Sequence, residues 1–193
     1  ANRLATDALS KIPTDTLADH FAAYGSERLR RSFARRMGYL HNIGTAKVIV
    51  RLWMKSGGPM DPATASKDDI VELLDRSGHL VPQDTLAVLT KMAASLTHDS
   101  HASIYLPRLA GIAQSIAFEP EFFEPACELL LLLELFSQEI SSGGCADHLT
   151  AMFNLYLSGT LAATDQKLKI VQDYVQSDDE RVRKLGFEML RNA

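Results

Sequence analysis

The clearest evidence for the fold class lies in the segment Thr164–Ala193, TDQKLKIVQDYVQSDDERVRKLGFEMLRNA. Apolar residues recur three and four positions apart in both of its halves, which places them on one face of a helix. They are Leu168, Val171 and Val175, followed by Val182, Leu185, Met189 and Leu190. Between the halves, Ser177 and Glu180 have the spacing of a capping box, in which each side chain bonds to the backbone amide of the other. The stretch therefore predicts two amphipathic helices joined by an acidic turn.

The same helical spacing recurs along the whole chain, and Gly or Pro residues separate the periodic segments. It predicts helices over Arg3–Lys11, Asp15–Tyr24, Glu27–His41, Thr45–Lys55, Lys67–Arg76, Gln83–Leu96, Ser103–Phe118, Glu121–Glu139, Ala146–Leu157, Asp165–Gln176 and Asp179–Asn192. Val48–Trp53 has the composition of a strand, but its spacing fits a helix equally well, and we predict a helix there. Glu121–Glu139 is apolar on every side near its centre, which indicates a helix inside the fold. The predicted class is all-α.

Three parts are expected along the chain. Residues 1–56 form an N-terminal helical subdomain, residues 57–66 form a linker rich in Gly and Pro, and residues 67–193 form a helical-repeat region. No Gly or Pro stop follows Met189, and residue 1 is Ala rather than Met, so we expect a piece of a longer protein.

The composition is that of a soluble globular protein, with 46% hydrophobic and 23% charged residues. The net charge of −4 provides no overall positive field for nucleic acid or an anionic membrane, and both are disfavoured as partners. The longest apolar run, Leu129–Leu133, is far shorter than the roughly 18 residues of a membrane span. Two cysteines and no signal-like start predict a reducing, cytoplasmic location without a disulfide between Cys127 and Cys145.

Two predicted turns hold residues of the kinds that bind zinc. His98 and His101 lie in one turn, and Cys145 and His148 lie near another. Structural zinc usually relies on several regularly spaced cysteines, and polar residues in turns commonly act as helix caps. We therefore predict no metal, although the sequence leaves open whether these four residues meet in space.

Catalytic motifs are missing from the sequence. Ser95 or Ser100 with His98 and Asp99 has the residue types of a hydrolase, but no Gly-x-Ser-x-Gly turn exposes a serine. No Gly-x-x-x-x-Gly-Lys-Ser/Thr loop is present to hold a nucleotide phosphate. We predict no catalytic residue, no cofactor and no ATP binding.

Seven residues are candidates for an interaction surface. Arg28, Arg31 and Arg35 fall on the helix face opposite the apolar stripe, where they could be a solvated face, an anion contact or a docking site for an acidic neighbouring domain. Arginine and aromatic residues dominate the binding energy of protein interfaces. The other four candidates are Tyr105, Tyr174, Arg181 and Arg183.

The final helix pair resembles a HEAT-type repeat, whose second helix opens with an acidic turn, a Val-Arg pair and then a small residue. Val182, Arg183 and Gly186 match that pattern. A second pair, Leu109–Leu133, has Glu119-Pro120-Glu121 at its turn and Ala126 at a similar place, but it lacks Val-Arg. The resemblance implies an irregular α-solenoid of stacked helical hairpins, although no fixed period can be counted along the other helices.

Two further segments, Ile116–Glu124 and Phe153–Thr160, resemble the helical region downstream of the nucleotide-binding module in large prokaryotic STAND-class NTPases. The likeness covers about Leu106–Ala193. It implies a non-catalytic superhelix that contacts a protein ligand and holds an ATPase inactive until the ligand engages. Several proteins of that class serve in antiphage defence.

These features lead to one functional hypothesis and two alternatives. We expect a non-catalytic interaction or sensor module of a larger cytoplasmic protein, which binds a protein partner or a neighbouring domain of its own chain. The first alternative is a free-standing helical adaptor or homodimer. The second is a helical domain that binds metal or nucleic acid. The sequence does not determine the oligomeric state.

Overall fold

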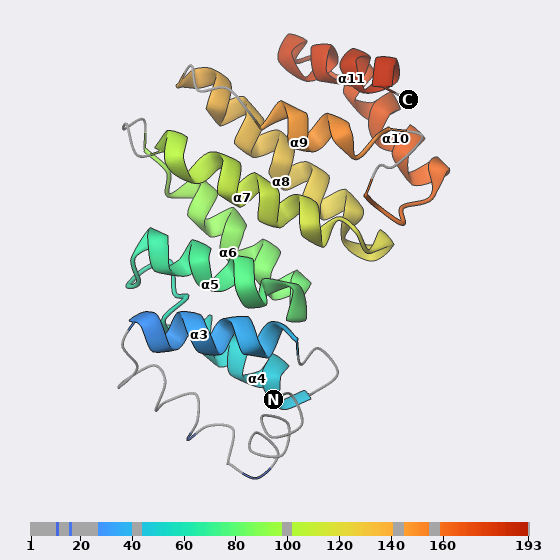
Figure 1. Ribbon diagram of the computed structural model, residues 1–193. Coiled ribbons are helices and arrows are strands. Elements are labelled where there is room, and N and C mark those ends of the chain that lie inside the picture. Colours follow the sequence, from blue (N-terminus) through green and yellow to red (C-terminus); the bar gives the residue numbers. More distant parts are fainter. Residues whose placement is uncertain are drawn as a thin grey trace. The chain divides into compact units, whose positions relative to one another are not determined.

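The computed structural model describes residues 11, 16, 27–39, 44–97, 102–140, 145–154 and 159–192. Every regular element of these residues is helical, and no strand occurs among them, which confirms the all-α prediction (Figure 1). The helices predicted over Arg3–Lys11 and Asp15–Tyr24 fall almost entirely outside the described residues. None of the helices that the structure describes combines the length and the apolar character needed to cross a bilayer.

The chain divides into two compact units, residues 1–92 and residues 93–193. This grouping differs from the boundary predicted at 57–66, because helix α3 (Glu27–Gly38) packs on helix α5 (Lys67–Ser77), which lies beyond that segment. The segment itself is packed into unit 1. Met60 is fully buried, and its amide donates to the carbonyl of Trp53 at 2.9 Å. The Gly-Pro-rich stretch is therefore an ordered loop within a unit.

Unit 1 contains α3, α4 (Gly44–Trp53), α5, the 3-10 turn η1 (Gly78–Leu80) and α6 (Pro82–Ala94), whose last two residues pass into unit 2. The segment Val48–Trp53 is helical, as predicted, and buries Ile49, Val50 and Trp53 on its inner side. The rings of Trp53 and Phe33 pack with their centroids 5.9 Å apart. The helical spacing of apolar residues therefore predicted the structure of this segment better than its strand-like composition.

Asp61 organises the loop that joins α4 to α5. Its carboxylate accepts hydrogen bonds from the amides of Gly57 at 2.8 Å and Ala63 at 3.0 Å, and from the Thr64 hydroxyl at 3.1 Å. The amide of Ala63, and then that of Gly57, holds the pKa of the Asp61 carboxyl below its usual value because both bonds favour the ionised form.

Asp61→Asn should lower the thermal midpoint of unfolding near pH 7 because one carboxylate acceptor is lost. A depressed folded-state pKa stabilises the protein above the unfolded-state pKa, and that contribution disappears as pH falls through the folded-state value. The difference between wild type and variant should therefore be largest near neutral pH and shrink in acid below about pH 4. Asp75→Asn is the matched control, since Asp75 is exposed and has only a 3.9 Å contact with Arg76. A difference that stays constant with pH would contradict this account.

Unit 2 contains α7 (Ala102–Ile116), α8 (Pro120–Glu139), α9 (Ala146–Ala151), α10 (Thr164–Val175) and α11 (Glu180–Asn192). Helices α7 and α8 lie side by side as a hairpin, and α9 packs on both of them (Figure 1). The rings of Phe123 of α8 and Phe153, just after α9, pack in the core at a tilt of 55° with their centroids 5.6 Å apart. Helix α9 ends at Ala151, earlier than the predicted Leu157.

The apolar centre of helix α8 is only partly covered, although its composition indicates a helix inside the fold. Leu129, Leu130 and Leu133 are buried, but Leu132 is 44% exposed, whereas Glu134 is only 6% exposed. The reason is that α7 and α9 cover one side of α8 and leave Leu132 outside. The carboxylate of Glu134 is therefore buried, whereas the more apolar side chain of Leu132 is exposed.

Helices α10 and α11 form the hairpin that the sequence predicts, with two local differences. The cap of α11 is Asp179, which accepts from the amide of Arg181 at 2.8 Å, whereas Ser177 accepts from the amide of Asp179 at 3.2 Å. The predicted capping box between Ser177 and Glu180 is therefore wrong, because the nearer carboxylate of Asp179 takes the cap. Gly186 faces α10 so closely that an added Cβ would lie 2.8 Å from the nitrogen of Val175.

Candidate functional site

A groove of about 910 Å³ runs along α11 in unit 2. Helices α8, α9 and α11 all contribute to its wall, and α11 supplies most of the residues. The lining consists of Glu134 and Gln138 from α8, Ala146 from α9, and Glu180, Arg181, Arg183, Lys184, Leu185, Phe187, Glu188 and Arg191 from α11. We call this feature the α11 groove.

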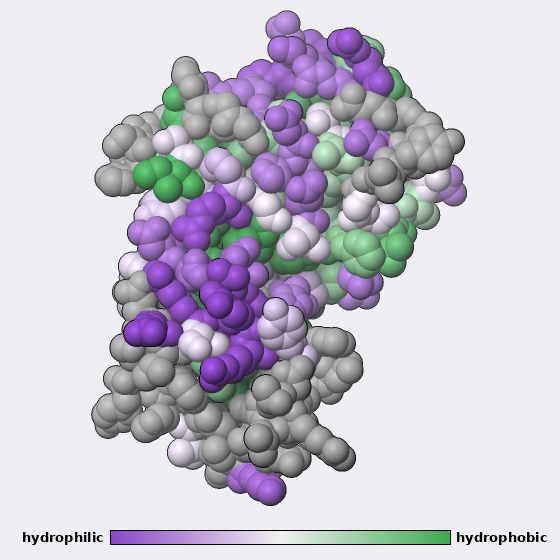
Figure 2. Space-filling view, viewed as in Figure 1, coloured by the Kyte–Doolittle hydropathy of each residue, from purple (hydrophilic) through white to green (hydrophobic). Residues whose placement is uncertain are grey.

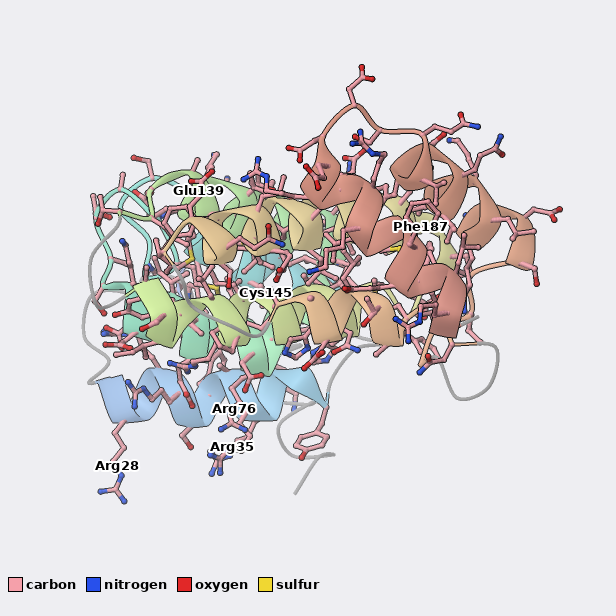
Figure 3. All side chains as sticks on the ribbon, turned by 90° about the horizontal axis from the view of Figure 1, so that it is seen from above. Arg28, Arg35, Arg76, Glu139, Cys145 and Phe187 are labelled. Carbon is pink, nitrogen blue, oxygen red and sulfur yellow. The ribbon has the colours of Figure 1, made fainter. Side chains whose placement is uncertain are left out.

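Phe187 is the main apolar feature of the α11 groove (Figure 3). Its side chain is 54% exposed, whereas Leu185 and Met189 on the same helix are buried. The helical spacing explains the contrast, because Val182, Leu185 and Met189 share the inner face of α11 and Phe187 lies off that face. An aromatic ring is thus held at the surface by a helix whose other face is anchored in the core.

Two arginines of the groove are already engaged. Arg181 pairs with Asp179 at 2.9 Å and with Glu139 at 3.5 Å, which fastens the start of α11 to the end of α8. Arg183 donates to the carbonyls of Ser177 at 2.7 Å and Asp178 at 2.8 Å, and so holds the turn between α10 and α11. Both were predicted as interaction residues, but these bonds give them a structural role in unit 2.

The remaining charges of α11 alternate in sign. Glu180, Lys184, Glu188 and Arg191 all line the groove, and the structure assigns none of them an ion-pair partner among the described residues. Lys184 and Arg191 are exposed. Charges at this spacing on a helix surface are neighbours and offset one another. The rim of the groove therefore presents both signs rather than a single field.

Glu134 lines the groove from α8 and is 6% exposed. Its Oε1 accepts from the side-chain amide of Gln138 at 2.8 Å, whereas its Oε2 is buried and has no hydrogen-bond partner among the residues that the structure describes. Buried polar atoms are almost always hydrogen-bonded, so an unmatched carboxylate oxygen calls for an explanation. It is the only carboxylate oxygen of the described residues in this condition.

The two cysteines are free and buried. Burial, and then the charge of Glu134, raises the pKa of the Cys145 thiol to about 12. Burial, followed by the charges of Glu124 and Glu128, raises the pKa of Cys127 as well. A thiol is nucleophilic as the thiolate, and both shifts favour the protonated form. Neither cysteine is set up for nucleophilic chemistry.

The predicted arginine surface lies in unit 1. Arg28, Arg31 and Arg35 line a second groove of about 530 Å³ together with Ser32 and Glu72. Arg28 and Arg35 project from α3 (Figure 3), and the surface over α3 and α5 is strongly hydrophilic (Figure 2). Arg31 pairs with Asp69 of α5 at 3.6 Å. The structure therefore brings these three arginines together on one face, with acidic residues of α5 beside them.

The two predicted tyrosines are not exposed anchors. Tyr174 was a candidate anchor only if exposed, but it is 9% exposed and its hydroxyl donates to the carbonyl of Cys127 at 3.4 Å. It shares the inner face of α10 with Ile170 and Val171, which explains its burial. Tyr105 of α7 is half-buried.

The four residues weighed as zinc ligands are only partly described. His98 and His101 lie outside the described residues. Cys145 is buried, and the Nδ1 atom of His148 lies 2.7 Å from the side-chain oxygen of Gln114 on α7. Within the described part of the chain, no group of three or more His, Cys, Asp or Glu residues could hold a metal ion.

Comparisons of the chain with protein-family models, curated proteins and solved structures give no significant match. We therefore infer the function of the chain from the geometry of the described residues. Sequence reasoning did not single out Glu134, Gln138, Lys184, Phe187 or Arg191. The one available signal was that Phe187 interrupts the apolar spacing of α11, because a large apolar residue off the buried face must either meet another surface or stay exposed.

Proposed function

We propose that this chain is a non-catalytic helical module of a larger cytoplasmic protein, and that it binds a segment of a protein ligand in the α11 groove. The observation that supports this function most directly is the groove itself, with the exposed ring of Phe187 between charges of both signs. Its volume of about 910 Å³ suits a few side chains rather than a whole domain. Aromatic anchors surrounded by polar residues are typical of protein interfaces.

The α10–α11 hairpin supports a HEAT-like module as part of this proposal. Each residue of the HEAT-like pattern has a physical role here. Val182 is buried, Arg183 donates to two carbonyls of the turn, and Gly186 permits close contact with α10. Such hairpins stack in series and leave binding surfaces along the array.

The relation to STAND-class NTPases is proposed from the two segments that resemble them. In unit 2 these segments are neighbours, since the rings of Phe123 and Phe153 pack together. The amide of Leu161, just after the second segment, donates to the carbonyl of Phe118 at 2.8 Å. The test is to read the coding sequence that adjoins residues 1 and 193. A Gly-x-x-x-x-Gly-Lys-Ser/Thr motif there would support the relation, and a complete frame without one would end it.

Phe187→Ser tests the groove as a binding site. A random peptide library displayed on phage is selected on the immobilised protein, and the selected peptides are synthesised and titrated. Loss of an aromatic anchor that the bound peptide would cover should weaken their binding by at least about tenfold. Leu161→Ser is the matched control, because Leu161 is 60% exposed in unit 2 but does not line the groove.

Equal binding by Phe187→Ser and wild type would place any ligand elsewhere and overturn the proposal. A selection that yields no specific peptide would do the same. Circular dichroism should give matching spectra for wild type and both variants, since both side chains are exposed.

The arginine face of α3 supports a second candidate, contact with an acidic neighbouring domain. Arg28 and Arg35 are both exposed, and seven residues of helix separate them by about 10 Å along its axis. Carboxylates at helical spacing on another domain would match that separation. Double-stranded DNA is the competing ligand, and its binding would fall steeply with added salt.

A further inference from the structure

We infer that the α11 groove takes a lysine or arginine side chain of its ligand, whose charged end pairs with the buried carboxylate of Glu134 while its aliphatic stem lies against Phe187. This inference rests on the proposed function and specifies the chemistry of the ligand. It assigns to Glu134 a recognition role that its sequence position, between leucines of an apolar helix, does not reveal.

The first observation is the incomplete bonding of Glu134. An ionised carboxylate has acceptor sites on both oxygens, yet only Oε1 has a donor, the amide of Gln138 at 2.8 Å. Oε2 is buried without a partner in the described part of the chain. Removing a charge from water without pairing it is strongly unfavourable, so a cation supplied by a ligand would be favoured at this place.

The second observation is that the nearby arginines are committed elsewhere. Arg181 is engaged with Asp179 and Glu139, and Arg183 with the carbonyls of Ser177 and Asp178. Lys184 and Arg191 line the same groove but are exposed at its rim, where Glu180 and Glu188 offset them. The groove therefore holds a carboxylate oxygen without a hydrogen-bond partner in its wall and side chains of both charges at its edge.

The third observation is that Phe187 lines the same groove as Glu134. Long basic side chains bury their methylene stems on apolar surfaces while their charged ends reach polar groups. A cation close to an aromatic face gains a further attraction. A lysine or arginine side chain satisfies both features of the groove with one residue, whereas an acidic side chain would be repelled by Glu134 and an aliphatic one would leave Oε2 unpaired.

The variant Glu134→Gln tests the inference by two measurements, the binding of peptides and the thermal stability of the free protein. The substitution keeps the acceptor for Gln138 and removes the charge. Peptides selected on wild type should contain lysine or arginine next to an apolar residue. In a peptide that contains arginine, replacing the arginine by citrulline, its uncharged isostere, should weaken binding to wild type by at least about tenfold. The Glu134→Gln variant should bind the arginine peptide and the citrulline peptide equally.

The free protein gives an independent readout. If the carboxylate has no partner before ligand binds, Glu134→Gln should leave the thermal midpoint unchanged or raise it. Glu128→Gln is the matched control, since Glu128 is an exposed glutamate of α8 outside the groove and should change neither the midpoint nor the binding. A lower midpoint for Glu134→Gln would mean that Lys184, Arg191 or another group already pairs with Glu134, and would overturn the inference.

The remaining outcomes separate the inference from the function on which it rests. Peptides that need Phe187 but bind equally with arginine or citrulline would leave the groove as a binding site and overturn the role of Glu134. A library that yields no peptide dependent on Phe187 would overturn both. Selected peptides rich in aspartate or glutamate would also overturn the cationic ligand.

Discussion

Phe123→Ala should destabilise the protein by about 3–5 kcal/mol, the usual cost of removing a phenyl ring from a core. Phe123 is fully buried, and its ring packs against that of Phe153 with centroids 5.6 Å apart. This pair joins α8 to the segment that follows α9, so the variant loses the ring contact and leaves a cavity between them. The free energy of unfolding is measured by circular dichroism in urea.

Phe118→Ala is the control for that experiment. Phe118 lies five residues earlier and is 45% exposed, and its contact with Leu161 is made by its backbone carbonyl, which alanine retains. The control should change the free energy of unfolding by less than about 1 kcal/mol. Similar losses for the two variants would mean that Phe123 and Phe153 do not form the core of unit 2.

Gly186→Ala should destabilise the α10–α11 hairpin by about 1–2 kcal/mol. The added Cβ would lie 2.8 Å from the nitrogen of Val175 and 3.0 Å from the Cβ of Tyr174, so the helices must separate. Such overpacking costs about 1–3 kcal/mol, which exceeds the gain of up to about 1 kcal/mol from replacing glycine in a helix. Peptide binding should weaken too, because α11 carries Phe187.

Gly111→Ala provides a control of opposite sign. Gly111 also lies inside a helix, α7, but the nearest atom to an added Cβ is the Cε1 of His148 at 3.8 Å, an ordinary contact. This variant should leave the thermal midpoint unchanged or raise it. The free energy of unfolding should increase by up to about 1 kcal/mol. If both glycine variants raised the midpoint, the close approach of α10 and α11 would be wrong.

The helices of the described residues could be predicted from the sequence because their signals are local. Apolar residues at helical spacing and the Gly and Pro residues between them fixed α10 and α11 to within one or two residues. Errors arose where several local bonds compete. At the start of α11, Ser177 and Asp179 are both capable caps, and only the path of the turn selects Asp179.

The candidate site could be predicted only in part. The sequence identified Arg181 and Arg183 in the right region, but their partners are Asp179, Glu139 and two turn carbonyls, so their role differs from the expected one. The sequence left open whether Tyr174 is exposed, and the structure buries it on the inner face of α10. An aromatic residue at helical spacing fits either place until the neighbouring helices are known.

The all-α class and the helical segments follow from local sequence patterns, since both depend on residues a few positions apart. Which faces of the helices are covered, and hence the site, follows only from the packing of distant segments. This packing buries Glu134 while Leu132 stays exposed, and it holds Phe187 outside while Val182, Leu185 and Met189 anchor the same helix. Burial depends on which distant segments pack together, a property that no local pattern of α8 or α11 contains.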